Sequence, residues 1–189
     1  SPIVRESAAS CFPKLSIDNF KKALNDSAVQ VRKAALESLL RSGKLSEEMM
    51  LYILDSVPHS DVRRVFKKLL LDRKLPDTVV DRLVRDPDSS LRAAVVQESS
   101  LTPEQLAAFL DEKDVDVVDS LVSVHLEDMP EEQQLKYVKF DLQHIQMGLA
   151  QSIYPKVLDA LAAGNLQEYV KRALLKNPKL KPALAKKFV

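Results

Sequence analysis

Glycine and aromatic residues are scarce in this sequence. Three glycines, six phenylalanines and four tyrosines occur among 189 residues, and tryptophan is absent. Few glycines leave little material for the tight turns of β-rich folds, and no glycine-rich phosphate-binding loop is present. Few aromatic side chains argue against a surface on which nucleic-acid bases stack. The composition therefore disfavours β-sandwiches, dinucleotide-binding sheets and P-loop folds.

Residues that carry catalysis or bind metals are also few. A single cysteine, Cys11, excludes an internal disulfide and a cysteine-ligated cluster. The spacing of His59, His125 and His144 matches no metal-binding motif. His125 falls at a helical phase that Phe12, Leu39, Leu70 and Ile153 occupy in other copies of the pattern described below, so we expect it to be buried and hydrogen-bonded. We expect no enzymatic activity, no metal and no cofactor.

Long apolar runs are missing as well, and the formal net charge is only +1. No apolar stretch approaches the roughly 18 residues of a membrane span, and charged residues near the N-terminus argue against a signal peptide. The 28 Lys and Arg nearly balance the 27 Asp and Glu, so no overall field attracts nucleic acid or a membrane. We expect a cytoplasmic protein without a membrane partner. Because the chain begins at Ser1 inside a predicted repeat, we expect it to be part of a longer protein.

A helical pattern recurs with a period of about 28 residues. Each copy opens with an apolar residue, usually followed by a basic or polar one, and mostly places a small side chain two residues later, where close helix packing requires it. Some ten residues further on, Leu or Met before Ser, Thr or Pro marks a second helix start. The opening pairs are Val4-Arg5, Val31-Arg32, Val62-Arg63, Leu91-Arg92, Val117-Val118, Ile145-Gln146 and Val170-Lys171. The second starts are Leu15, Leu45, Leu75, Leu101 and Met129, followed less regularly by Ile153 and Leu180.

Each copy therefore predicts two short helices, A and B, with one buried stripe apiece. Neither helix buries its stripe alone, so the copies must stack. The segment 86–95, continuing to 101–106, resembles the leucine-rich-repeat variant subgroup of HEAT-like proteins. The resemblance implies a single all-α domain over 1–189, a right-handed α-α superhelix of about seven two-helix repeats. The repeats run over residues 1–25, 26–55, 56–85, 86–111, 112–140, 141–164 and 165–189.

Aspartate-rich turns join the predicted repeats and precede an arginine in the next A helix. We expect their carboxylates to cap that helix and to face its arginine, as in Asp26 with Arg32 and Asp86 with Arg92. Two interpretations of the series Arg5, Arg32, Arg63 and Arg92 are open. In the functional one, the arginines bind a row of phosphates. In the structural one, they form ion pairs that join adjacent repeats, and the recurring acidic partner favours this interpretation.

One column of B-helix residues is expected to point outward. Counted from the Leu or Met that opens each B helix, position plus seven lies between the predicted core positions and faces the inner side of a HEAT-like array. This column contains Lys22, Tyr52, Arg82, Ala108, Lys136, Ala160 and Lys187. At position plus three stand acids such as Asp18 and Glu132, which predict ion pairs with Lys22 and Lys136 one helical turn away.

The leading functional hypothesis is a non-enzymatic scaffold or adaptor that binds another protein or peptide. Its predicted binding residues are Lys22, Tyr52, Arg82, Lys136 and Lys187. The alternative is nucleic-acid binding through the same basic residues and the C-terminal lysines. It is supported by residues 171–189, which contain seven basic residues and no acidic one, whereas 111–135 contains nine acids and one lysine. A subunit of a HEAT-like enzyme is a third class, and it requires a pocket of converging polar groups.

Overall fold

The computed structural model describes residues 16–43, 45–72 and 74–188. Every regular element in these ranges is a helix, which confirms the predicted all-α class. The chain forms two compact units, Ser1–Asp86 (unit 1) and Pro87–Val189 (unit 2). Their boundary falls close to the predicted junction of the third and fourth repeats. The opening pair Val4-Arg5 and Cys11 lie outside the described residues.

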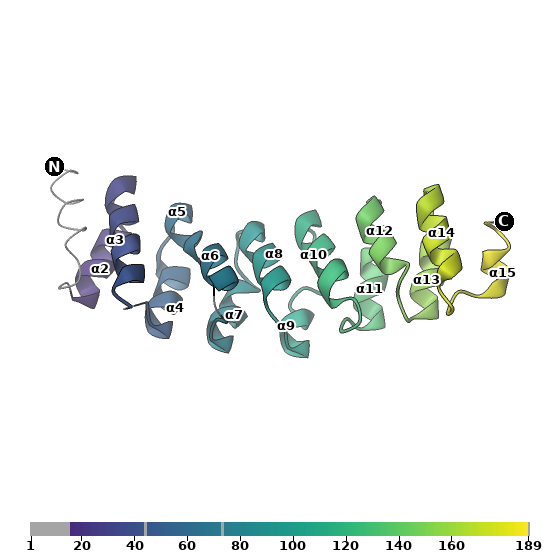
Figure 1. The fold of residues 1–189 in the computed structure, drawn as a ribbon, viewed down its shortest axis with the longest axis horizontal. Helices are drawn as coiled ribbons and strands as arrows, with labels where there is room; N and C mark the ends of the chain where they lie inside the picture. Colours follow the sequence, from purple (N-terminus) through teal and green to yellow (C-terminus); the bar gives the residue numbers. More distant parts are fainter. Residues whose placement is uncertain (1–15, 44, 73, 189) are drawn as a thin grey trace. The chain divides into compact units, whose positions relative to one another are not determined.

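Unit 1 places predicted A helices beside A helices and B helices beside B helices (Figure 1). α3 packs against α5 among the A helices, and α4 packs against α7 among the B helices. The third A helix differs from the prediction because it is broken at Arg64 into α5 and α6, next to the bulky Val65 and Phe66. The helices are α2 (Ile17–Leu24), α3 (Val29–Arg41), α4 (Glu47–Ser56), α5 (Ser60–Arg63), α6 (Val65–Asp72) and α7 (Asp77–Leu83).

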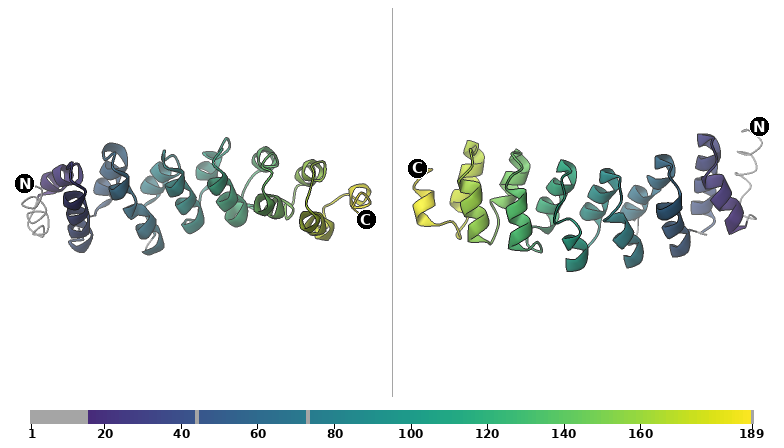
Figure 2. Two further views of the ribbon diagram at one scale, coloured as in Figure 1. Left: turned by 90° about the horizontal axis from the view of Figure 1, so that it is seen from above. Right: turned by 180° about the vertical axis from the view of Figure 1, so that it is seen from behind.

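Unit 2 repeats the same arrangement in two layers (Figures 1 and 2). The A helices α8, α10, α12 and α14 pack in that order, and the B helix α11 packs against α13. The helices are α8 (Ser89–Glu98), α9 (Pro103–Ala107), α10 (Val115–His125), α11 (Glu131–Tyr137), α12 (Gln143–Leu149), α13 (Pro155–Ala162), α14 (Glu168–Lys176) and α15 (Pro182–Ala185).

Hydroxyl and carboxylate caps begin several of these helices, as the sequence predicts. Ser46 Oγ accepts from the Met49 amide at 3.3 Å, and Thr102 forms a complete capping box with Gln105. Aspartates of the turns cap two A helices: Asp88 accepts from Ser90 N at 2.9 Å, and Asp114 accepts from Asp116 N at 3.1 Å. Asp26 instead accepts from the amide of Ala28, the residue before α3, and α3 has no side-chain cap. Each cap satisfies an amide that has no partner inside its helix.

Apolar side chains between the two layers form the core. Its largest fully buried members include the aromatic residues Phe20, Phe66, Phe109 and Tyr137, although aromatic residues are scarce in the sequence. Around them lie aliphatic residues of both helix types, such as Ile53. Within each unit, both A and B helices therefore contribute buried side chains to the core.

Gly148 lets α12 approach α10 closely. A Cβ built on Gly148 would overlap Cγ1 of Val122, which confirms that the small residue at this phase is needed for packing. We expect Gly148→Ala to destabilise the protein by about 1–3 kcal/mol through overpacking, measured by urea denaturation. Because the clash is with one side chain, adding Val122→Ala should recover part of the loss. The control is Gly164→Ala, whose added Cβ comes no closer than 3.3 Å to the Leu161 carbonyl, and an equal loss there would contradict this account.

Candidate functional site

The predicted binding column lies on B helices, one residue to each helix. Within unit 1, Lys22 is on α2, Tyr52 on α4 and Arg82 on α7. Within unit 2, Lys136 is on α11, and Lys187 follows α15. Lys22, Arg82 and Lys187 are exposed, whereas Tyr52 and Lys136 are half-buried. The outward direction predicted for this column therefore holds, with two residues partly covered.

Tyr52, the predicted aromatic anchor, is contacted by residues of the preceding B helix, α2, and of its C-cap. Asn25 Nδ2 donates a hydrogen bond to the Tyr52 hydroxyl at 3.0 Å. The ammonium of Lys21 lies 4.8 Å from the centre of the Tyr52 ring, within the range of a cation–π interaction. A ligand that uses this ring must therefore share it with Lys21 or displace it.

Arg82 and Lys136 each form an ion pair with an acid of the preceding B-helix segment. Arg82 Nε donates to Asp55 Oδ1 at 2.9 Å, and Lys136 Nζ lies 2.8 Å from Asp111 Oδ1. Lys136 also lies 3.9 Å from Glu132, which confirms the predicted pair one turn away. The two long-range pairs have the same register as the contact between Asn25 and Tyr52. Positions are again counted from the residue that opens each predicted B helix. In all three contacts, the residue at position plus ten of one repeat meets the residue at position plus seven of the next.

A second series of contacts joins the starts of successive B helices. Thr78 Oγ1 donates to Glu47 Oε1 at 2.6 Å in unit 1, and Lys156 Nζ lies 3.1 Å from Glu131 Oε2 in unit 2. Both contacts join position plus two of one predicted repeat to position plus three of the next. We use the name B-helix face for Tyr52 and Arg82 with their partners in unit 1 and for Lys136 with its partners in unit 2. Within each unit, it is a surface of polar pairs that join successive B helices.

The pair between Lys136 and Asp111 makes a prediction about titration. The hydrogen bond from Lys136 and then its charge lower the pKa of Asp111 below its usual 3.8. In Lys136→Met we expect the pKa of Asp111 to return towards 3.8, measured by carbon-13 NMR of the carboxyl group. The control is Lys139→Met, because Lys139 contributes less to the lowered pKa. An equal change in both variants would refute the direct pair.

Among the described residues, the arginines of the predicted series lie on A helices and contact acids of the following turn. Arg32 donates through Nη1 to the carbonyls of Asp26 and Ser27 at 2.7 and 3.1 Å. Its Nε and Nη2 donate to the carboxylate of Asp61 at 3.0 Å. The predicted contact with Asp26 therefore exists at the main chain, and the salt bridge is with the following turn. The same forward direction places Arg63 on Asp86 and Arg92 on Glu112.

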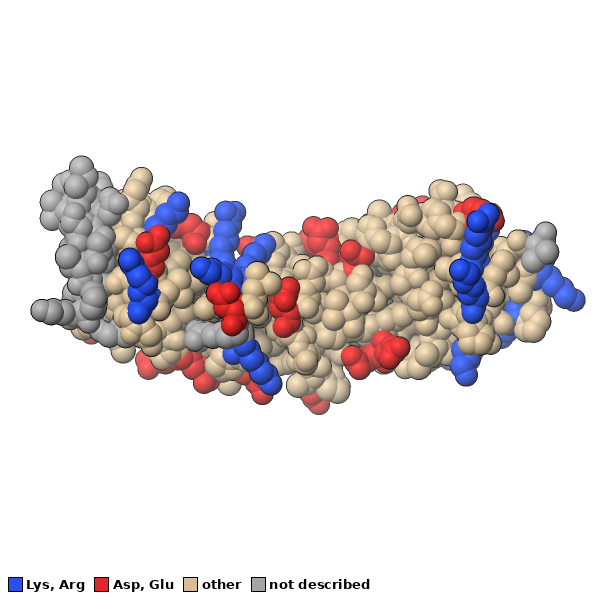
Figure 3. Space-filling model, in the orientation of Figure 1, with Lys and Arg blue, Asp and Glu red and all other residues tan. Residues whose placement is uncertain are grey.

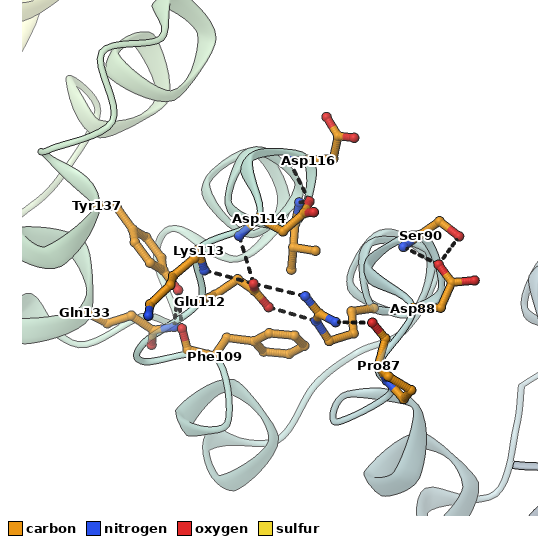
Figure 4. A network of polar contacts seen from close by, with 12 residues as sticks. Pro87, Asp88, Ser90, Phe109, Glu112, Lys113, Asp114, Asp116, Gln133 and Tyr137 are labelled. Atoms are coloured by element: carbon orange, nitrogen blue, oxygen red, sulfur yellow. Dashed lines mark hydrogen bonds and ion pairs between the residues drawn. The ribbon is translucent and has the colours of Figure 1, made fainter.

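Geometry explains why the salt bridges differ from the expected pairs. An arginine early in an A helix has its own turn on one side, where main-chain carbonyls accept hydrogen bonds. The other edge of its guanidinium faces the next turn. Figure 4 shows the Glu112 carboxylate at this position, where it also accepts from the amides of Lys113 and Asp114 at 2.8 and 2.9 Å. Arg32 and Arg92 thus join adjacent turns, and Arg63 joins the Leu54 carbonyl of α4 to Asp86 in the next turn. These contacts support the structural interpretation over a phosphate ladder.

Burial and hydrogen bonding act in opposite directions on these acids. Burial alone would raise the pKa of Glu112, but the hydrogen bonds from Arg92 and two backbone amides outweigh it, so the pKa is lowered. Burial likewise acts against Asp61, and the hydrogen bond and charge of Arg32 lower its pKa on balance. Both carboxylates are therefore held in the charged form that the arginines require.

A polar network inside unit 2 was not predicted. Gln134 Nε2 donates to the carbonyls of Leu126 and Met129 at 2.8 and 3.0 Å, and Gln134 accepts from the Ser152 hydroxyl at 2.6 Å. Asn177 then donates to the carbonyl of Ser152 at 2.9 Å. These contacts connect three successive turns between A and B helices. The sequence contains a sign of this network. Gln133 and Gln134 stand four and five residues after Met129, at positions that the repeat pattern assigns to the core, and buried glutamines need hydrogen-bond partners.

The histidines occupy separate places. His125 is buried, and its Nε2 lies 2.9 Å from the Val96 carbonyl, which confirms the predicted buried and hydrogen-bonded role. His59 stands at the N-cap position of α5 without a side-chain cap, and His144 is exposed with Nε2 at 3.5 Å from Asp119 Oδ1. No group of three or more His, Cys, Asp or Glu that would suit a metal ion occurs in the part of the chain that the structure describes.

The basic C-terminal segment is partly neutralised by its neighbours. Blue side chains gather over α14 and α15 in Figure 3. Arg172 lies 3.6 Å from Glu168, and Lys171 lies 4.0 Å from the same carboxylate. Lys181 pairs with Asp159. The positive charge predicted for the alternative nucleic-acid surface is therefore reduced by acids that lie outside residues 171–189 in the sequence.

No family model matches this chain, and neither a curated protein nor a solved structure matches it. Among the described helices, none is both long and apolar enough to cross a membrane.

Proposed function

We propose that this chain is a HEAT-like helical-repeat module, similar to leucine-rich-repeat variants and wound as a right-handed superhelix. In this proposal it acts as a scaffold that binds another protein through the B-helix face. The supporting observation is the constant register of the contacts between successive B helices, in which Asn25 with Tyr52, Asp55 with Arg82 and Asp111 with Lys136 occupy equivalent positions. Equivalent side chains at regular intervals are how repeat proteins present an extended binding surface.

The polar composition of this face favours a protein partner. Arg82 is 54% exposed and its partner Asp55 is 43% exposed at the side chain, so a ligand can reach both charges of the pair. A folded protein or peptide offers both acids and bases to such alternating charges. A nucleic-acid backbone offers only negative charge, and the acids beside Arg82 and Lys136 would repel it.

Charge-swapped pairs test this proposal while the contacts between helices are retained. One variant combines Arg82→Asp with Asp55→Arg, and another combines Lys136→Asp with Asp111→Lys. A partner protein is first captured with the wild-type chain. Its affinity for the wild-type chain and for each swapped variant is then measured by calorimetry. Because each swap keeps an ion pair but reverses the charges presented, we expect affinity to fall about tenfold or more for each. The matched control swaps Glu168 and Arg172, an exposed pair on α14.

Two results would count against the proposal. Unchanged affinity in both swapped variants, with hydrogen exchange protection away from the B helices, would exclude this face as the binding surface. A gel shift with DNA or RNA at low salt that disappears steeply as salt rises would replace the protein partner by nucleic acid. Circular dichroism spectra equal to wild type would show that the swapped variants are folded.

A further inference from the structure

A concave surface lies in unit 2, and its lining includes none of the predicted binding residues. A groove of about 640 Å³ opens between the end of α8, the start of α9 and the end of α10. A smaller hollow of about 370 Å³ adjoins it at the end of α10, and the two share Val124 and Asp128. We name this surface the turn groove and define it by Glu98, Leu101, Leu106, Val124, His125 and Asp128.

The charges of the turn groove are all negative. Glu98 and Asp128 line it and are exposed, and Glu127 lines the adjoining hollow. Helices α8 and α10 both end here, and helix C-termini carry partial negative charge. Neither hollow has a Lys or Arg among its described lining residues. The surface is therefore suited to a cation.

His125 and Asp128 show where the cation would lie. His125 is 5% exposed, and its Nε2 lies 2.9 Å from the Val96 carbonyl, which accepts but cannot donate. Nε2 therefore carries a proton, and in the neutral ring Nδ1 is an acceptor. Nδ1 lies 3.6 Å from Asp128 Oδ2, which is within ion-pair distance but too far for a hydrogen bond. In the neutral ring, Nδ1 and this carboxylate are two facing acceptors, and an ammonium group, with three N–H bonds, can donate to both.

Apolar side chains beside this pair add a second recognition element. Val124 is 49% exposed, Leu101 is half-buried, and Leu106 lies beneath the groove. An aliphatic side chain next to a lysine would cover Val124 and Leu101 and remove that apolar surface from water. The shared residues of the two hollows allow an extended chain to cross the end of α10.

The sequence indicates that this chemistry is particular to two of the predicted repeats. The corresponding turn is basic in other repeats, with Arg41 and Lys44 in the second and Lys176 and Lys179 in the seventh. In the fourth and fifth repeats it carries Glu98, Glu127 and Asp128 instead. The repeat pattern alone does not require acids at this position.

We propose that the turn groove binds an extended, lysine-containing segment of a partner protein. The lysine ammonium donates to His125 Nδ1 and Asp128, Glu98 adds negative charge, and an aliphatic neighbour of the lysine packs on Val124 and Leu101. The inference concerns a surface other than the B-helix face and goes beyond the proposed function.

A nitrogen-15 NMR titration with the peptide acetyl-Leu-Lys-Leu-amide tests this directly. We expect saturable shifts at the amides of residues 97–101 and 124–128, with a dissociation constant on the order of 1 mM because the peptide is small. A peptide with norleucine in place of lysine keeps the aliphatic chain without the ammonium. It should bind at least about tenfold more weakly, since an ionic hydrogen bond is lost.

Exposed acids provide variants that keep the fold. Asp128→Asn should weaken the lysine peptide about tenfold and Glu98→Gln less, because Asp128 contacts the ammonium directly. Glu48→Gln on α4 of unit 1 is the matched control and should leave binding unchanged. Unperturbed NMR spectra away from the groove show that each variant is folded.

Several outcomes would overturn this proposal. Shifts that are absent, that are spread over both units, or that persist in Asp128→Asn would exclude the site. Equal binding of the norleucine peptide would exclude the ammonium, and equal binding of n-butylamine would exclude a peptide segment. Shifts at the same amides on concentrating the protein alone would assign the groove to a second copy. None of these results bears on the B-helix face, which the charge-swapped pairs test separately.

Discussion

Replacing Arg32 by methionine is expected to lower the free energy of unfolding by about 3–5 kcal/mol. Arg32 is 6% exposed and donates to the Asp61 carboxylate and to the carbonyls of Asp26 and Ser27. Methionine fills a similar volume but donates no hydrogen bond. The loss therefore comes mainly from a carboxylate and two carbonyls whose guanidinium partner is gone.

Urea denaturation followed by circular dichroism measures this effect. The control is Lys33→Met, the exposed neighbour on the same helix, which should change stability by no more than about 0.5 kcal/mol. Hydrogen exchange should also show lost protection in the turns that contain Asp26 and Asp61. Equal stability of the two methionine variants would refute the role of Arg32 as a lock between turns.

Acid should have a related effect on the same contact. Because Arg32 lowers the pKa of Asp61 in the folded state, this group stabilises the protein at pH values above its unfolded pKa near 3.8. That stabilisation is lost as the pH falls through the lower, folded pKa. In Arg32→Met the pKa of Asp61 should rise, and this part of the pH dependence should disappear.

Truncating Tyr137 to alanine should lower the free energy of unfolding by a similar amount, about 3–5 kcal/mol. Tyr137 is fully buried, so the truncation leaves a cavity in the core of unit 2. Its hydroxyl also donates to the Phe109 carbonyl and accepts from Gln133 Nε2 at 3.1 Å (Figure 4). Tyr137→Phe removes these hydrogen bonds alone and should cost about 1–3 kcal/mol.

Urea denaturation of both variants separates the cavity from the hydrogen bonds. The half-buried Tyr154 provides the control, and Tyr154→Phe should have a smaller effect than Tyr137→Phe. If Tyr137→Phe had the same free energy of unfolding as wild type, the hydrogen bonds of the Tyr137 hydroxyl would contribute nothing to stability.

Alkaline titration tests the same environment. Burial raises the pKa of Tyr137 from 10.0 to about 12. Its contribution to stability is therefore complete below pH 10 and is lost as the pH rises towards 12. Ultraviolet difference spectra should show an ionisation step near pH 12, and this step should be absent from Tyr137→Phe.

The helices and their ends were predictable because their signals are local. Ser46 and Thr102 cap the helices that follow them, and Gly148 marks a close approach, since each depends on a few neighbouring residues. The break at Arg64 has no such signal, because neither glycine nor proline stands there.

The partners of the polar residues were harder to predict because acids stand on both sides of each arginine in the sequence. Spacing alone does not tell whether Arg32 forms its salt bridge with Asp26 or with Asp61. On the B-helix face, the outward direction of Arg82 follows from helical periodicity. Its partner Asp55 is visible only when helices α4 and α7 are placed side by side.

The forward direction of the arginine contacts has a consequence for how such a chain can grow. Each predicted repeat of this type offers an acid to its predecessor and an arginine to its successor, as Asp61 and Arg63 do within one turn of α5. Duplicating the gene segment that encodes such a repeat would place two identical copies in tandem. The arginine of the first copy would then meet the acid of the second copy, and the new junction would have its salt bridge. The fifth repeat has Val118 where the arginine would stand. A duplicate of this repeat would therefore form no such salt bridge with the repeat that follows it.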